Sequence, residues 1–124
     1  MPDYLYFDLR QLKETTACNE AMAQEVLQSF TLHFPGLLTT ARKSLSGRDV
    51  KNLQQCFHQI KASLGLLSRN TLYEEAVAVE QSLVNIHHRR VLLNTYVVLQ
   101  KMEVLIKEAQ QVSIGQTSLQ KIYE

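Results

Sequence analysis

The chain has 124 residues with a formal net charge of +1, from 13 basic and 12 acidic side chains. This length predicts a single domain that is large enough to bury a hydrophobic core. The near-neutral charge argues against a nucleic-acid-binding protein, which needs a basic surface. Hydrophobic residues make up 45% of the chain, but no apolar run is long enough to cross a bilayer, so we expect a globular protein that does not span a membrane.

The N-terminus and the cysteines bear on the compartment. The sequence Met-Pro-Asp-Tyr has no basic segment followed by an apolar core, so we expect no secretory signal and a cytoplasmic location. The starting Met and the length favour a free-standing protein. Cys18 and Cys56 lack metal-ligand spacing, which predicts two reduced, structural thiols and no metal site.

The first third of the chain predicts one short and one long helix. Residues 8–11 indicate the cap and first turn of the short helix, and Tyr4, Tyr6 and Phe7 before it are typical of a hydrophobic plug. A long helix is expected from about residue 19 to residue 45, with a bend at Pro35. Its apolar face consists of Leu27, Phe30, Phe34, Leu37, Ala41 and Leu45.

The remainder predicts three more helices. Gly47 is a C-terminal signal and Asp49 an N-cap, which begins a helix that ends near residue 67. Thr71 and Glu74 form a capping box that opens the next helix. The last helix follows the basic cluster at residues 87–90. The three apolar stripes are Leu53, Phe57, Ile60, Leu64 and Leu67; Leu72, Ala76, Val79, Leu83 and Ile86; and Leu92, Thr95, Leu99, Met102, Leu105 and Ala109.

The architecture follows from these segments. Short connections between long amphipathic helices make neighbours antiparallel, which predicts an all-α, up-down-up-down four-helix bundle with a short extra N-terminal helix. We expect this domain over residues 1–112 and a frayed or flexible tail over residues 113–124, where the period is lost. The cluster at residues 87–90 is interpreted as cations at a helix C-terminus, which the helix dipole favours.

His58 is the candidate for chemistry. At about 100° per residue it lies roughly 140° from the centre of its apolar stripe, so it should face water. Its neighbours on that face are Gln54, Lys61, Ala62 and Gly65. One cation and two small side chains beside an exposed imidazole suit a reaction on the surface of another protein. A solvated or packed histidine is the common alternative for a lone histidine on a helix.

The segment from His58 to Gly65 resembles the histidine-containing phosphotransfer (HPt) domain, whose core pattern is His-x-x-Lys-Gly followed by small residues and a glycine. His58 matches the phosphoryl-accepting histidine, Lys61 the lysine and Gly65 a downstream small position. Ala62 and Ser68 depart from the pattern, because the family usually has glycine at these positions. The alanine adds only one methyl group, so docking is expected to survive with a tighter or more selective fit. The likeness covers about residues 7–110 and includes Phe7, Asp8, Leu9, the segment 25–30, Pro35, Asp49, Leu53, Leu72, Ala76 and Glu80.

The resemblance implies a phosphorelay intermediate. His58 would accept a phosphoryl group from an aspartyl phosphate on a receiver domain and pass it to another receiver, while Lys61 neutralises part of the charge. The implied partners are response-regulator receiver domains and a hybrid sensor histidine kinase. Mg²⁺ is expected in the partner receiver and no cofactor in this chain, which would be a monomeric carrier and not an enzyme with its own turnover.

The same resemblance places the docking surface. Gln54, Gln55 and Gln59 flank the site and are expected to contact the receiver or the phosphoryl group, and Ala62 and Gly65 are expected to leave space for the receiver. The neighbouring helix is expected to contribute Leu37 and Leu38.

The other three histidines are not expected to carry the chemistry. His33 is interpreted as a packing residue at the core edge, and His87 and His88 as exposed residues at a chain reversal. No Glu-x-x-His motif, Walker-type loop or nucleophile elbow is present. The alternatives are a bundle that binds a receiver or histidine kinase without carrying phosphate, and a helical adaptor unrelated to signalling.

Overall fold

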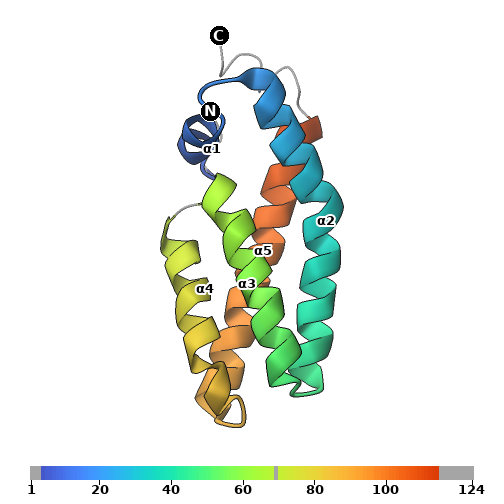
Figure 1. Ribbon diagram of the computed structural model, residues 1–124, viewed down its shortest axis with the longest axis vertical. Helices are drawn as coiled ribbons and strands as arrows, with labels where there is room; N and C mark the ends of the chain where they lie inside the picture. Colours follow the sequence, from blue (N-terminus) through green and yellow to red (C-terminus); the bar gives the residue numbers. More distant parts are fainter. Residues whose placement is uncertain (1–3, 69, 115–124) are drawn as a thin grey trace.

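The computed structural model describes residues 4–68 and 70–114. Within these ranges the protein is all-helical, and the only pairing of extended backbone is an isolated bridge between Phe7 and Ser68. Figure 1 shows the long helices packed side by side, with the short first helix at one end. The elements are α1 (Leu9–Thr15), α2 (Glu20–Ser46), α3 (Val50–Leu67), α4 (Asn70–Ser82), the 3-10 turn η1 (Leu83–Asn85) and α5 (Arg89–Ile114).

One hydrophobic core lies between the long helices. Helix α2 packs against α3 and α5, and α4 packs against the same two helices. The predicted apolar stripes are confirmed, since all their members are buried except Leu37 and Leu92, which are half-buried at the core edge. Periodicity was sufficient here because a helix of this length can bury its apolar side chains only along one face.

The N-terminal segment closes one end of the core, as expected. The Asp8 side chain caps α1 by accepting hydrogen bonds from the backbone N–H groups of Arg10 and Gln11 at 3.0 and 3.2 Å. The Phe7 ring is buried and lies edge-on to the Tyr4 ring. The mostly buried Glu108 carboxylate of α5 accepts the N–H groups of residues 5, 6 and 7, which fastens this segment to the bundle.

Helix α2 passes through Pro35 without a break. In Figure 1 its first half leans relative to its second half. Proline removes one backbone donor and crowds the preceding turn, and a bent helix accommodates both effects.

Gly47 ends α2 and Asp49 caps α3, as predicted, but the residue with a positive φ in this turn is not the glycine. Gly47 is the C-cap, but its φ is −85°, and Arg48 is the residue with a positive φ of 56°. The guanidinium Nη1 of Arg48 donates to the backbone carbonyls of Leu45 (2.6 Å) and Ser46 (3.2 Å). The Leu45 carbonyl also accepts the backbone N–H of Arg48 at 3.2 Å, so the guanidinium group adds to the hydrogen bonds at the helix end. The side chain thus helps to hold a backbone conformation that usually favours glycine.

Three predicted helix boundaries also require correction. Helix α4 begins at Asn70, so Thr71 lies inside the helix and is not its N-cap. Helix α5 begins at Arg89, so Arg89 and Arg90 lie at a helix N-terminus and not at a C-terminus, because the turn that follows η1 takes up only residues 86–88. Helix α5 also continues to Ile114, two residues beyond the expected limit of the domain. The rest of the expected tail lies outside the described residues.

Candidate functional site

Helix α3 presents His58 to solvent. The Asp49 side chain caps the helix by accepting the N–H of Asn52 at 3.2 Å, and the apolar stripe fixes the rotation of the helix by burying one face. His58 lies off that stripe and is exposed, as predicted. Its imidazole is therefore available to a reagent carried by another molecule.

The exposed surface of α3 beside His58 carries only small side chains at two positions. Ala62 and Gly65, four and seven residues further along α3, are both exposed. The nearest neighbour that a Cβ on Gly65 would meet is the Tyr73 ring, at 3.9 Å, which is an ordinary contact. The Gly65 carbonyl accepts a hydrogen bond from Gln11 Nε2 at 2.8 Å. Glycine is thus not required there by packing, and its effect is to keep the exposed surface free of side chains.

Lys61 lies one turn after His58 and makes an ion pair with Glu80 of α4. Both side chains are only 22% exposed. The helical repeat predicts Lys61 on the water-facing side, whereas in the structure its ammonium group lies at the boundary between α3 and α4. An ion pair that is partly withdrawn from water is screened less than one on the surface. Glu80 therefore holds the positive charge in a defined place on the α4 side of His58.

A hollow of about 400 Å³ lies on the other side of α3, between α3 and α2. We name it the α2–α3 hollow. On the helical wheel His58 and Lys61 occupy the flank of α3 next to α4, and the residues that line this hollow occupy the flank next to α2. Gln55 and Ala62 form the ridge between the two flanks. The hollow is lined by Glu25, Val26, Ser29, Phe30, His33, Phe34, Leu37, Gln59, Ser63 and Leu66.

The predicted docking residues divide among these surfaces. Gln55 is exposed on the ridge, Gln59 and Leu37 line the hollow, and Gln54 is half-buried on the flank next to α4. Leu38 was predicted wrongly, because it is only 2% exposed and cannot contact a partner. Adjacent residues of a helix point about 100° apart, so Leu37 and Leu38 lie on opposite flanks of the core stripe of α2.

Several residues near the site were not anticipated. His33, expected to pack at the core edge, is exposed and lines the α2–α3 hollow. Leu66 is 40% exposed at the same hollow, and its place off the apolar stripe of α3 was a signal that the sequence already contained. Ser63 and the partnership of Glu80 with Lys61 depend on which helices are neighbours, and periodicity does not reveal this.

The two cysteines differ in their surroundings. Both are free thiols, but Cys18 is exposed and Cys56 is buried. Burial raises the pKa of the Cys56 thiol above its ordinary value, and the negative charge of Asp49 raises it further. A structural role therefore fits Cys56 and does not fit Cys18. Among residues 4–68 and 70–114, no group of three or more His, Cys, Asp or Glu side chains is arranged to hold a metal ion.

Comparisons with known proteins found no matching family model, no similar curated protein and no similar solved structure. In the described part of the chain, none of the helices combines the length and the apolar character needed to cross a membrane.

Proposed function

We propose that this protein is a phosphorelay intermediate in which His58 carries the phosphoryl group. The observation that carries the proposal is the exposed imidazole of His58 beside the low surface of Ala62 and Gly65, with a positioned lysine one turn away. A phosphoryl donor held in a second protein needs unobstructed access to its acceptor, and this arrangement provides it.

The transfer step needs few groups from this chain. A ring nitrogen of His58 attacks the phosphorus of an aspartyl phosphate on a receiver, so that a P–N bond forms as the P–O bond to the aspartate breaks. The receiver aspartate leaves as a carboxylate with the bonding electron pair. The reverse step returns the group to a receiver. Positioning and charge dominate phosphoryl transfer, and we assign Mg²⁺ to the partner receiver. The chain is then a carrier and not an enzyme.

Lys61 has an electrostatic role in this proposal. The phosphorylated imidazole carries negative charge spread over three oxygens, which a nearby ammonium group stabilises. Glu80 keeps that ammonium group on the flank of α3 next to His58, and a phosphoryl group on His58 would compete with Glu80 for it.

We place receiver docking across α3, from His58 over the ridge to the α2–α3 hollow. Apolar side chains of the receiver would fill the hollow against Leu37 and Leu66, and Gln59 would offer hydrogen bonds at its edge. The finer architecture that we propose is the antiparallel up-down-up-down four-helix bundle. The short connections at residues 47–49 and 86–88 support it, as does the packing of each long helix against two others. We further propose that the protein is a cytoplasmic monomer and that a hybrid sensor histidine kinase is the source of its phosphoryl groups.

Incubation with a receiver domain bearing a radiolabelled aspartyl phosphate tests the function. Acid-labile, alkali-stable label on the wild-type chain, absent from His58→Gln and retained by His33→Gln, supports the proposal. The second variant is matched because His33 is also exposed and lies at the same docking surface. Stable binding without label supports the alternative of a non-phosphorylated interaction module. Neither label nor binding, tested across several receivers, contradicts both.

A further inference from the structure

A second exposed apolar surface lies on α5, away from His58. Leu93, Tyr96 and Val97 are 55%, 48% and 46% exposed. Spacings of three and four residues place all three on one face of the helix. The other exposed large apolar residues in the described ranges are isolated along the chain. We name this surface, together with the hollow beside it, the α2–α5 patch.

The hollow of the patch has a volume of about 410 Å³ and is lined by Arg42, Leu45, Ser46, Arg48, Leu92, Leu93 and Tyr96. Its floor is apolar, and its only charged lining residues are the two arginines. A concave apolar site with a few convergent polar groups is typical of a binding site. The charges at this site specify a negatively charged ligand.

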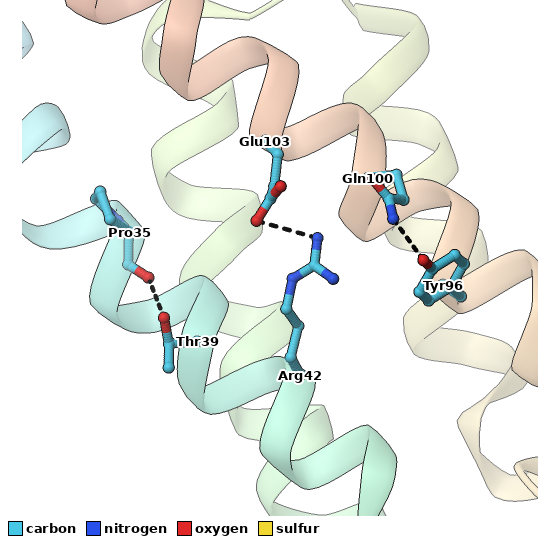
Figure 2. A network of polar contacts seen from close by, with 6 residues as sticks. All are labelled: Pro35, Thr39, Arg42, Tyr96, Gln100 and Glu103. Atoms are coloured by element: carbon cyan, nitrogen blue, oxygen red, sulfur yellow. Dashed lines mark hydrogen bonds and ion pairs between the residues drawn. The ribbon is translucent and has the colours of Figure 1, made fainter.

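Arg42 has donors to spare. Figure 2 shows its guanidinium group between α2 and α5, facing Glu103, whose Oε1 lies 3.2 Å from Arg42 Nη2. The distance satisfies an ion pair, but the groups are not aligned for a hydrogen bond, and Nε and Nη2 are buried without a hydrogen-bond partner among the described residues. Buried donors of this kind destabilise a protein until an acceptor reaches them. Nε and Nη2 are closed to solvent, so a carboxylate of a partner would pair instead with the exposed part of the Arg42 side chain, which is 31% exposed.

Three further cations surround the apolar face. The backbone carbonyls at the end of α2 hold the Arg48 guanidinium at the rim of the hollow. Arg89 and Arg90 are exposed in the first turn of α5, where the helix dipole disfavours positive charge. Arg89 lies four residues before Leu93 and so on the same face of α5.

We propose that the α2–α5 patch is a docking surface for an acidic amphipathic helix of another protein. Apolar side chains of that helix enter the hollow beside Leu93 and Tyr96, and flanking carboxylates pair with Arg42 and Arg48. A second copy of the chain fits poorly, because symmetric pairing would bring the arginines of the two copies together. The apolar centre of the patch distinguishes it from a phosphate-backbone site.

The position of the patch makes this site independent of the proposed transfer. His58 is on α3, the patch is on α2 and α5, and the main neighbours of α5 are α2 and α4. A helix bound at the patch leaves the exposed face of α3 uncovered. The protein would then hold this partner and a receiver at the same time, which would keep a phosphoryl carrier near one assembly.

A selection experiment tests the proposal. Helix-forming peptides of random sequence are displayed and selected on the full chain, and the affinity of the recovered peptides is measured by fluorescence anisotropy. We expect peptides with Asp or Glu flanking apolar positions at helical spacing. The chemical-shift perturbations that these peptides cause in the protein should map to Leu93 and Tyr96. Tyr96→Glu and Arg48→Gly should each weaken binding at least tenfold.

Two controls make the outcome decisive. Arg48→Gly tests charge without endangering the fold, because glycine adopts the positive φ at this position freely. Leu66→Glu makes the same kind of change as Tyr96→Glu but at the α2–α3 hollow, and it should leave peptide affinity unchanged. Recovery of no peptides, recovery of non-acidic peptides, or equal binding by wild type and Arg48→Gly would overturn the proposal. So would a dimer in sedimentation analysis that Leu93→Glu dissociates.

Discussion

The α2–α3 hollow and the hollow of the α2–α5 patch are alike in size and differ in charge. The α2–α3 hollow and the hollow of the α2–α5 patch have volumes of about 400 and 410 Å³, and both use α2 as one wall. The charged or titratable lining residues of the first are Glu25 and His33, whereas those of the second are Arg42 and Arg48. Size therefore does not distinguish what each site binds. The charges at the rim distinguish the two sites, because a partner of like charge is repelled.

The cation beside His58 and a cation of the α2–α5 patch also differ in how well they are partnered. Lys61 and Glu80 are equally withdrawn from water and form a closed pair. Arg42 pairs with Glu103, whose side chain is 48% exposed. The Nε and Nη2 atoms of Arg42 have no hydrogen-bond partner among the described residues. The Lys61–Glu80 pair holds its positive charge in a defined place near His58, whereas the Arg42–Glu103 pair is more exposed.

The largest effect is expected when the proposed phosphoryl acceptor is removed from one of the two regions. His58→Gln should abolish phosphoryl labelling and leave peptide binding at the α2–α5 patch unchanged, because the two surfaces belong to different helices. Thermal unfolding should show little change, since exposed polar substitutions usually cost less than about 0.5 kcal/mol. Labelling that persists at another histidine would refute the assignment.

A bulky side chain on the ridge of α3 should block docking. We expect Ala62→Leu to slow transfer from the receiver at least tenfold with an unchanged melting temperature, because the position is exposed. Ala62→Gly is the matched variant, and it should transfer as well as wild type or better while losing up to about 1 kcal/mol of stability. Normal transfer by Ala62→Leu would show that the receiver docks elsewhere.

The closed ion pair should have an intermediate effect. Lys61→Ala is expected to slow transfer or shorten the lifetime of the phosphohistidine about tenfold, the scale of roughly 1 to 2 kcal/mol for a partly exposed charge contact. Glu80→Gln keeps Lys61 but removes its ion-pair partner, so the effect on transfer should be smaller than that of Lys61→Ala. A double-mutant cycle measured on transfer rates checks the coupling, and additive effects would contradict a positioning role for Glu80.

Gly65→Ala separates stability from access. A Cβ fits at 3.9 Å from the Tyr73 ring, and alanine is favoured over glycine within a helix by roughly 0.5 to 1 kcal/mol. The variant should therefore unfold at a higher temperature yet transfer more slowly, by less than the effect of Ala62→Leu. A variant that is both more stable and fully active would show that the small side chain serves no docking purpose.

The smallest effect is expected at a pair that belongs to neither hollow. Lys101 of α5 donates to both carboxylate oxygens of Glu75 of α4, at 2.9 and 3.0 Å. This hydrogen bond raises the pKa of Lys101 above its ordinary value of 10.5. A raised pKa stabilises the folded state below pH 10.5, and the contribution is lost as the pH rises through the folded-state value.

Lys101→Met should therefore lower the free energy of unfolding by less than about 1 kcal/mol near neutral pH, because the pair is partly exposed and screened. The difference from wild type should shrink above pH 10.5, which chemical denaturation at several pH values measures. Neither phosphoryl transfer nor peptide binding should change. A change in either function would show that the two regions communicate through the α4–α5 contact.

Local pattern determined much of this protein before its structure was considered. The apolar stripes, the Asp8 and Asp49 caps and the exposure of His58 follow from the helical repeat and from hydrogen bonds within one turn, and the structure confirms all of them. These features depend on residues three or four positions apart, so the sequence already contains both partners of each interaction.

Tertiary packing decided the rest. The burial of Leu38, the pairing of Lys61 with Glu80 and the hollow on each side of α2 depend on which helices are neighbours and how each is rotated. The periodicity of one helix contains no information about the rotation of another. The unpartnered donors of Arg42 likewise arise only once α2 and α5 have packed. The sequence by itself determined which surface of α3 is exposed, and packing decided which charges and cavities lie around it.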